Sequence, residues 1–291
     1  MTHKKKKRNI ITKKDKIEVF INSCINDDLY MSIFFEDNLE VTQLVVNILL
    51  NRKDLIVKSV KTQIDLNNLL GKGIKLDILA KTETGEYINI EIQNIRNKYI
   101  NKRARYYSSM LDINSLKKGD KYEKLKDNYV IFVLNNEKSI GKNNIAIYNY
   151  DRYSLEINKP LNDGSHIIIV NGNYQGDDDV GKLMHDFKQV NSKDMHFEIL
   201  RKRNDELKEL IVKGEISETM NKALNKLLKK AKAIGMEEGE SIGEARGRSE
   251  GEARGEARGR SEGQKITYKN MLKEGRITQE EYNQFVLAIE M

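Results

Sequence analysis

The sequence predicts an α/β domain in which helices flank a mixed sheet, followed by a helical and partly flexible C-terminal extension. Residues 17–200 mix helix-like and strand-like patterns. Two strand-like runs flank a turn at Glu83-Thr84-Gly85, and another apolar strand spans residues 129–134. Both kinds of pattern within one stretch of this length indicate an α/β domain. A glycine repeat then separates this domain from a last helical segment.

Composition excludes several classes of protein. The 291 residues carry 51 Lys and Arg against 44 Asp and Glu, a net charge of +7. The first sixteen residues hold eight basic residues and one Asp, so this tail accounts for the whole excess. The apolar runs are far shorter than the ~20 residues of a membrane span, and we expect no secretory signal. The single cysteine, Cys24, excludes an intramolecular disulfide, so we expect a cytoplasmic protein.

Changes in composition divide the chain further. A basic tail at 1–16 precedes the α/β domain at 17–200, and a charged helix with apolar spacing follows at 201–234. Residues 235–263 carry glycine at every fourth position, with Glu and Arg between. Each glycine costs about 1 kcal/mol of helix propensity relative to alanine, so we expect a frayed helix or flexible spacer. A packed helix dimer along the glycines is the open alternative, and it would make the C-terminal region a homo-oligomer contact.

Residues 264–291 return to a helical pattern and predict a pair of helices. Gly275 suits the cap that ends the first helix, and Thr278 with Glu281 has capping-box spacing for the second. We interpret the pair as a docking module. A DNA-binding helix-turn-helix is less favoured because nothing basic lies on the second helix.

The stretch 71–93 carries the chemistry. Its two strand-like runs join at Glu83-Thr84-Gly85, a three-residue loop whose glycine supplies the left-handed position. A hairpin centred on this loop places Asp77 directly opposite Glu91. With a period of two, one face is entirely apolar and is predicted to face a core, whereas the other carries both acids. The apolar face consists of Leu76, Ile78, Ala80, Ile88, Ile90 and Ile92. The face with both acids consists of Asp77, Leu79, Lys81, Tyr87, Asn89, Glu91 and Gln93.

Carboxylates at directly opposite positions have Cβ atoms about 4.5–5.5 Å apart. At that distance Asp77 and Glu91 need a shared proton, a nearby cation or a bound metal. Oxygen-rich sites with some water suit Mg²⁺ or Mn²⁺. Acids at strand ends are also common as solvated residues. From the residues alone, a metal site and a pair of solvated acids both remain open.

Asp77, a second strand and then Glu91-Ile92-Gln93 resemble the signature of PD-(D/E)XK nucleases. The variant with glutamine in the lysine position is similar to the Rpn family of recombination-promoting nucleases, which are also labelled transposases. The resemblance covers roughly residues 9–200. The segments that carry it are Phe34-Phe35-Glu36-Asp37, residues 44–50, Arg103-Ala104-Arg105-Tyr106-Tyr107, residues 116–122 and the strand 129–134.

The resemblance implies a restriction-endonuclease-like mixed sheet flanked by helices. It also implies a metal-dependent DNA endonuclease that hydrolyses phosphodiester bonds in DNA recombination or mobile elements. Asp77, Glu91 and Gln93 would then be catalytic, with Mg²⁺ or Mn²⁺ as the cofactor. The implied metal ligands are Asp77, Glu91, the backbone carbonyl of Ile92 and, as the acid on a helix, Glu40 with Glu36 or Asp37 behind it. The alternative is a catalytically silent DNA-binding or protein-interaction module on a nuclease fold.

Two departures from the nuclease signature matter. Leu76 stands where proline is common, and Gln93 replaces the lysine that would hold the scissile phosphate or the attacking water. The Rpn family usually carries glutamine there, so the change does not argue for inactivation. The source of positive charge is left open. Lys75 and Lys81 share a face with Asp77 in the predicted hairpin and are candidates.

DNA is the expected partner. The basic residues that follow the hairpin favour phosphate contacts beside the site, with a solvated helix face as the alternative. These residues are Arg96, Lys98, Lys102, Arg103 and Arg105. Tyr106 and Tyr107 are interpreted as core packing on a helix that covers the sheet. Asp177-Asp178-Asp179 is interpreted as a solvated turn or a helix N-terminus, because adjacent Asp residues lack the alternating spacing of calcium loops.

Overall fold

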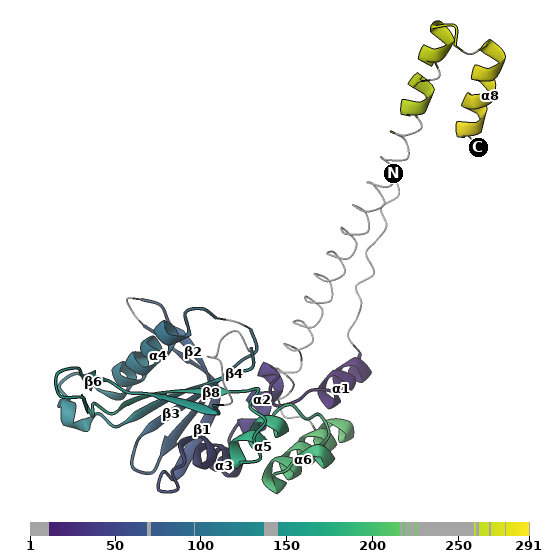
Figure 1. Ribbon diagram of the computed structural model, residues 1–291. Coiled ribbons are helices and arrows are strands. Elements are labelled where there is room, and N and C mark those ends of the chain that lie inside the picture. Colours follow the sequence, from purple (N-terminus) through teal and green to yellow (C-terminus); the bar gives the residue numbers. More distant parts are fainter. Residues whose placement is uncertain are drawn as a thin grey trace. The chain divides into compact units, whose positions relative to one another are not determined.

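Figure 1 shows the computed structural model of the chain. It describes residues 12–68, 71–95, 97–136, 145–215, 262–267, 269–276 and 278–290, with single residues at 218, 221, 225 and 259. The chain divides into two compact units, residues 1–228 and 229–291. Most of the predicted basic tail, most of the glycine repeat and Arg96 lie outside the described residues. Among the described residues, no helix is long and apolar enough to cross a membrane.

The first unit is a mixed six-stranded sheet flanked by helices, as the sequence predicts (Figure 1). The strand order is β1-β2-β3-β4-β8-β5, in which β3, β4 and β8 run parallel and the other neighbours antiparallel. The strands of this sheet are β1 (Val57–Leu66), β2 (Ile74–Thr82), β3 (Tyr87–Gln93), β4 (Asn128–Leu134), β5 (Ile147–Tyr150) and β8 (Ser165–Asn171). The helices of this unit are α1 (Lys13–Ile21), α2 (Asp28–Phe35), α3 (Leu39–Leu50), α4 (Ile100–Ser115), α5 (Asp179–Asp186) and α6 (Glu198–Lys213), with 3-10 turns η1 (Tyr122–Lys124) and η3 (Ser192–Asp194).

The β2–β3 hairpin has the predicted register. Its pairs run from Ile78–Ile90 to Lys81–Tyr87, which is the pairing of a hairpin centred on Thr84. Gly85 has a φ of 101°, the left-handed conformation that the loop requires and that glycine adopts without strain. This register places Asp77 and Glu91 at the next opposed position along the two strands. The sequence therefore predicts the local geometry of the site through its turn.

Two hydrophobic clusters cover the two faces of the sheet. The larger one is formed with α1, α2, α3, α5 and α6, and it includes Ile78 and Ile90 from the hairpin. The smaller one is formed with α4 on the other face of the sheet (Figure 1), and it includes Tyr107 and Phe132. The charged helix predicted from residue 201 is represented by α6, whose Leu207 and Ile211 belong to the larger cluster. The candidate acids thus lie on strands that are buried from both sides.

The predicted alternation of faces is wrong at one position. Leu76 was expected on the face of Ile78, but it packs in the smaller cluster beside α4. The exchange of faces coincides with Gln63 on the neighbouring strand, which has a φ of 53° between the pairs Thr62–Ile78 and Ile64–Leu76. A non-glycine residue with this φ is uncommon. Asp77 occupies the position where the two faces exchange.

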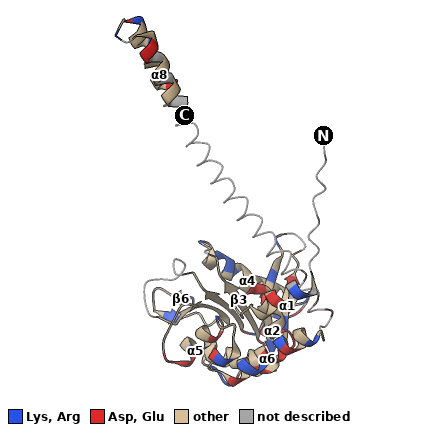
Figure 2. Cartoon of the chain, turned by 90° about the vertical axis from the view of Figure 1, so that its right-hand side faces the viewer, with Lys and Arg blue, Asp and Glu red and all other residues tan. Residues whose placement is uncertain are grey.

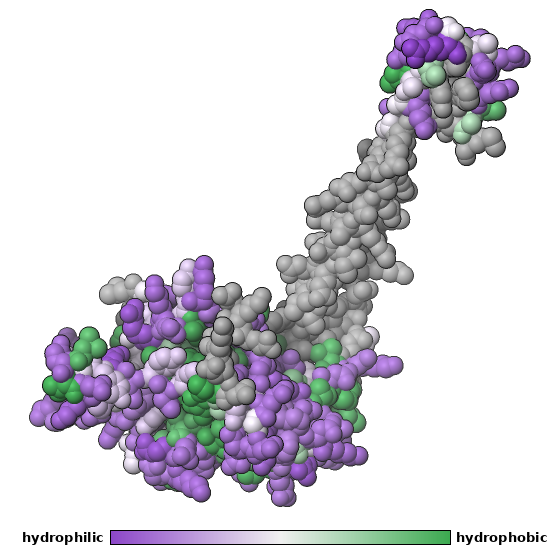
Figure 3. All heavy atoms as spheres, in the orientation of Figure 1, coloured by the Kyte–Doolittle hydropathy of each residue, from purple (hydrophilic) through white to green (hydrophobic). Residues whose placement is uncertain are grey.

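A small hairpin carries apolar side chains into solvent. It consists of β6 (Tyr153–Ser154) and β7 (Lys159–Pro160) and forms a separate two-stranded sheet. Leu155 is 92% exposed, and Ile157 and Leu161 are also exposed. Figure 3 shows a green, apolar patch at the end of the first unit where Figure 1 places β6.

The second unit contains α8 (Gln279–Glu290), preceded by helical residues at 262–267 and 269–273. The predicted caps are present. Gly275 has a φ of 69° and its amide bonds to the carbonyl of Leu272. Thr278 and Glu281 form a reciprocal capping box, in which the Thr278 amide donates to Glu281 Oε2 at 2.7 Å and the Glu281 amide donates to Thr278 Oγ1 at 3.3 Å.

Candidate active site

Asp77 and Glu91 lie opposite each other on β2 and β3, and each carboxylate accepts from a backbone amide of the opposite strand. The Asp77 amide donates to Glu91 Oε1 at 2.9 Å, and the Ile92 amide donates to Asp77 Oδ2 at 3.4 Å. Gln63 Nε2 donates to the second oxygen of Asp77 at 3.3 Å. Glu91 is fully buried and Asp77 is partly buried. The structure therefore brings the two predicted acids together and fixes each one by the backbone of the opposite strand.

The surroundings raise the pKa of both carboxyls. Burial is the largest cause for Glu91, followed by the charge of Asp77. Burial is also the largest cause for Asp77, followed by the charge of Asp28 at the start of α2. The backbone amides and the charge of Arg103 act in the opposite direction. Two buried carboxyls of raised pKa are stabilised when a cation is bound or a proton is shared.

Arg103 provides a positive charge inside this site. From the first turn of α4 its guanidinium donates to Glu91 Oε2 at 2.7 Å and to Gln93 Oε1 at 2.7 Å. Its Nε donates to the hydroxyl of Tyr107 at 2.9 Å. The guanidinium also lies over the rings of Tyr107 and Phe132, 4.9 and 5.3 Å from their centroids. Arg103 is thus oriented toward the carboxylates, and its side chain is only 27% exposed.

A family model described as PD-(D/E)XK nuclease family transposase matches residues 30–242. The match covers well over half of the chain and includes both strands of the hairpin and α4. The chain belongs to this family. No match was found among curated proteins or among solved structures.

Of the residues that the sequence predicts as the PD-(D/E)XK signature, Asp77 lies on β2 and Glu91-Ile92-Gln93 lies on β3. Gln93, which is predicted to occupy the lysine position, is neutral. Its Oε1 accepts from Arg103, and its Nε2 donates to the carbonyl of Ile92 at 3.2 Å. A guanidinium from another element, α4, therefore lies beside this neutral side chain. The sequence offered no means of selecting Arg103 from the five basic residues near the site, because only packing against Tyr107 and Phe132 turns it inward.

The donor set suits a hard divalent cation. Asp77, Glu91 and the Ile92 carbonyl offer oxygen atoms only, the ligands that Mg²⁺ and Mn²⁺ prefer. The raised pKa of the buried carboxyls also fits, because a cation would stabilise their ionised forms. The residues present are therefore consistent with the divalent metal of the family.

Four acidic residues on or beside helices bear on the predicted helix acid. Glu40 is exposed at the start of α3. Glu36 accepts a hydrogen bond from a backbone amide of β1, and Asp37 pairs with a lysine of the same strand. The helix carboxylate whose charge acts on Asp77 is Asp28, in the first turn of α2. Sequence reasoning missed Asp28, although an acid that opens a helix whose next seven residues are buried is a signal that could have found it.

The remaining predicted DNA contacts lie on the surface near the start of α4. Lys98 and Lys102 place their ammonium groups 5.0 and 5.9 Å from the ring centroid of Tyr99. Arg105 is exposed one turn further along the helix. Figure 2 shows basic residues on the same part of the fold in blue. The structure separates these three residues, which face solvent, from Arg103, which faces the carboxylates.

Other sequence predictions are resolved by packing. Lys75 and Lys81 are both exposed, and Lys81 lies over the ring of Tyr87. Tyr107 is buried beside Phe132, so the prediction of core packing is confirmed. Tyr106 packs at the edge of the same cluster. The acidic triplet forms the N-terminus of α5, where Asp178 Oδ1 accepts from the Gly181 amide at 2.8 Å.

Proposed function

We propose that this protein is a metal-dependent DNA endonuclease that hydrolyses phosphodiester bonds, with Mg²⁺ or Mn²⁺ as its cofactor, in DNA recombination or mobile elements. One observation supports this most strongly. The buried Glu91 carboxylate lies beside the partly buried Asp77 and the guanidinium of Arg103, within the part of the chain that matches a nuclease family. A purely structural role would not require two acids of raised pKa to be buried side by side.

Each residue has a chemical role in this proposal. Asp77, Glu91 and the Ile92 carbonyl hold the cation, which when bound polarises the phosphoryl group and lowers the pKa of a water molecule. Arg103 favours the ionised form of Glu91 through a charge-assisted hydrogen bond, which opposes the effect of burial on the Glu91 pKa. Gln93 can donate to or accept from the attacking water. Arg103 supplies the positive charge that other PD-(D/E)XK nucleases take from the motif lysine, and the developing charge on oxygen is stabilised by it.

The surface beside the site supports DNA as the substrate. Lys98, Lys102 and Arg105 surround the start of the helix that carries Arg103. Contacts from such residues to phosphates give affinity without sequence information. The proposal therefore assigns cleavage to the hairpin and backbone binding to α4.

Nicking of supercoiled plasmid tests the proposal. Wild type, Asp77→Ala, Glu91→Ala and the double variant are compared in Mg²⁺ and in EDTA at fixed low salt. Asp65→Asn is a matched control, because this acid is exposed on the neighbouring strand β1. We expect wild type and Asp65→Asn to cut in Mg²⁺ only, and the other variants to lose cutting. Absence of cutting by wild type with retained, salt-sensitive DNA binding would favour the catalytically silent module.

A further inference from the structure

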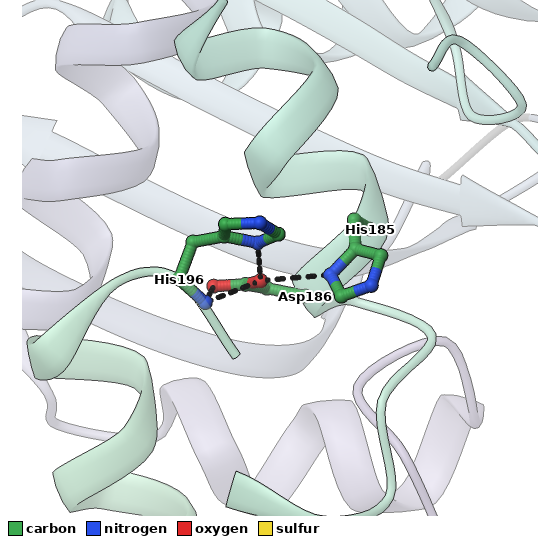
Figure 4. Close-up of side chains that lie close together, drawn as sticks. All are labelled: His185, Asp186 and His196. Atoms are coloured by element: carbon green, nitrogen blue, oxygen red, sulfur yellow. Dashed lines mark hydrogen bonds and ion pairs between the residues drawn. The ribbon is translucent and has the colours of Figure 1, made fainter. Parts of the chain in front are cut away.

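A second cluster of titratable side chains lies between α5 and α6 (Figure 4). His185 and Asp186 end α5, and His196 precedes α6 by two residues. The Nδ1 atoms of His185 and His196 lie 3.2 and 2.9 Å from the same oxygen, Asp186 Oδ1. One ligand atom from each of the three residues lies within 4.8 Å of the others. The cluster is independent of the candidate active site, because it shares no residue with it.

The carboxylate of Asp186 is the reason to look for a cation. Its side chain is fully buried, and within the described residues its ion-pair partners are these two imidazoles. Both of its oxygens accept from the His196 amide, at 2.8 and 2.9 Å, and Oδ2 also accepts from the Phe197 amide at 2.9 Å. Buried charges in proteins are paired or bind metals. Imidazoles supply a positive charge only when protonated, whereas a divalent cation between them supplies it directly.

The geometry of the three atoms fits a small tetrahedral centre. Zinc–nitrogen and zinc–oxygen bonds of about 2.0–2.2 Å separate the ligand atoms of a tetrahedral centre by about 3.3–3.6 Å. His185 Nδ1 lies 3.2 Å from Asp186 Oδ1, just below that range, and His196 Nδ1 lies 2.9 Å away and would have to move outward by a few tenths of an ångström. The imidazole rings are nearly perpendicular, at 76°, with both Nδ1 atoms directed at the same oxygen (Figure 4). A cation could therefore contact all three residues after small side-chain movements.

A cavity gives access to the cluster. It has a volume of about 310 Å³, and both imidazoles line it together with Asp177, Lys182, Lys188 and Gln189. The side chains of His185 and His196 are 44% and 45% exposed, so one side of the cluster is open. Two nitrogens and one oxygen favour transition-metal dications over Mg²⁺. We propose that His185 Nδ1, His196 Nδ1 and Asp186 Oδ1 form a second metal site that binds a dication of the zinc class, with its fourth position open to this cavity.

Gln189 completes the surroundings of the site. Its Nε2 lies 3.1 Å from Nε2 of His185. With a metal on Nδ1, the Nε2 of His185 carries the proton, and the amide of Gln189 can turn its oxygen toward it. Metal-bound imidazoles commonly donate their other N–H to such an acceptor, which fixes the ring.

The position of the site gives it a structural consequence. A cation there would join the end of α5 to the start of α6 across residues 187–195. The carbonyl of Phe187 accepts from the Asn26 amide at 3.0 Å, and the carbonyl of Asn26 accepts from Asn94 beside the E-x-Q motif at 2.7 Å. Binding energy at the site therefore stabilises the folded state.

Zinc binding by the full chain without an affinity tag tests the proposal. Wild type, His185→Gln/His196→Gln and His166→Gln are stripped with EDTA, dialysed and titrated with ZnCl₂ by calorimetry. Glutamine keeps a donor toward Asp186, so the double variant should fold. His166 is a matched control, because this half-buried imidazole also lies beside a carboxylate, Asp127, at 3.1 Å. The variant Asp77→Ala/Glu91→Ala lacks the carboxylates of the candidate active site, so zinc that it binds is not held by them.

We expect one zinc ion per chain in wild type, in His166→Gln and in the active-site variant. The double histidine variant should bind at least tenfold more weakly and should lose the rise in Tm that ZnCl₂ gives the others. With Co²⁺ as a probe, the intense visible absorption of a tetrahedral site should appear in wild type and in the variants that keep both histidines, and it should be absent from His185→Gln/His196→Gln. Equal zinc binding by wild type and the double variant, or none by wild type, would overturn the proposal and leave Asp186 as a clamp for the amides of residues 196 and 197.

Discussion

The guanidinium of Arg103 bridges Glu91 and Gln93, donating at 2.7 Å to a carboxylate oxygen of the first and at 2.7 Å to the amide oxygen of the second. One side chain on α4 thus contacts both polar ends of the E-x-Q motif on β3. The motif lysine of related nucleases is a point charge on the strand itself. In this protein a planar guanidinium, packed against two adjoining aromatic rings, reaches the motif from the side.

Replacing Arg103 should reduce cleavage more than it reduces folding. Loss of a preorganised group at the developing charge costs about 10²–10³ in kcat, so we expect at least a hundredfold loss for Arg103→Met. Arg103→Lys keeps the charge but cannot bridge two acceptors, and its loss should be smaller. Single-turnover cleavage under saturating Mg²⁺ measures both. A Tm close to wild type is the control for folding, because Glu91 can take up a proton when its partner is removed. Unchanged kcat in Arg103→Met would remove Arg103 from the mechanism.

A second-site substitution separates charge from packing. Gln93→Lys puts an ammonium next to the guanidinium of Arg103, so on its own it should not increase cleavage. In the Arg103→Met background the same substitution restores a cation at the motif position. We expect it to recover at least tenfold of the lost kcat, measured in a double-mutant cycle. Additive losses in the double variant would show that the position of the charge, rather than its presence, matters.

The residues of the β2–β3 turn made the juxtaposition of Asp77 and Glu91 predictable. The loop that ends with Gly85 fixes the register, and the register alone places Asp77 opposite Glu91. The same alternation failed at Leu76, opposite the position where Gln63 of the neighbouring strand has a positive φ, a feature that has no signal in the hairpin itself. The sequence of a hairpin therefore predicts how its own two strands pair better than it predicts which face a side chain takes next to a third strand.

The tertiary surroundings of the site were less predictable. Arg103 faces inward because α4 packs on Phe132 of β4. The charge of Asp28 acts on Asp77 because α2 packs against β2, the strand that carries Asp77. Both contacts join residues that lie far apart in the chain. Spacing within a motif carries no information about them. Sequence reasoning therefore put Glu40 first for the helix acid, with Glu36 or Asp37 behind it, and grouped Arg103 with four other basic residues as candidate phosphate contacts.

Asp28 and Glu40 should differ in their effect on metal binding. The charge of Asp28 acts on Asp77 and adds to the negative potential of the site. Groups that support metal ligands commonly change affinity by about 10–100-fold, so Asp28→Asn should raise the Mg²⁺ concentration for half-maximal cleavage by about tenfold. Glu40→Gln, at the start of the next helix, is the matched control and should leave it unchanged. The reverse pattern would return the role to Glu40.

The stability of the metal-free protein should fall as pH rises. Burial raises the pKa of Asp77 and Glu91 in the folded state, so above the ordinary carboxyl pKa of about 4 the folded state holds more protons than the unfolded state. Their contribution to stability is then present at low pH and lost as pH rises through the raised values. Urea unfolding in EDTA from pH 5 to pH 8 measures this loss. Asp77→Asn/Glu91→Gln should flatten the profile, and Mg²⁺ should restore stability at pH 8 in wild type only.

DNA binding should depend on salt through the surface of α4. Each phosphate contact contributes about 0.9 to the slope of log K against log salt. Lys98→Ala/Lys102→Ala/Arg105→Ala should therefore lower the slope by about 2–3 and weaken binding equally for unrelated DNA sequences, because phosphate contacts carry no sequence information. The control variant Lys121→Ala/Lys124→Ala/Lys213→Ala removes the same charge from ion pairs on η1 and α6. Fluorescence anisotropy over a range of KCl concentrations measures both slopes. Equal slopes in the two triple variants would show that binding follows net charge rather than the face next to the carboxylates, and DNA would then have to approach the site from another direction.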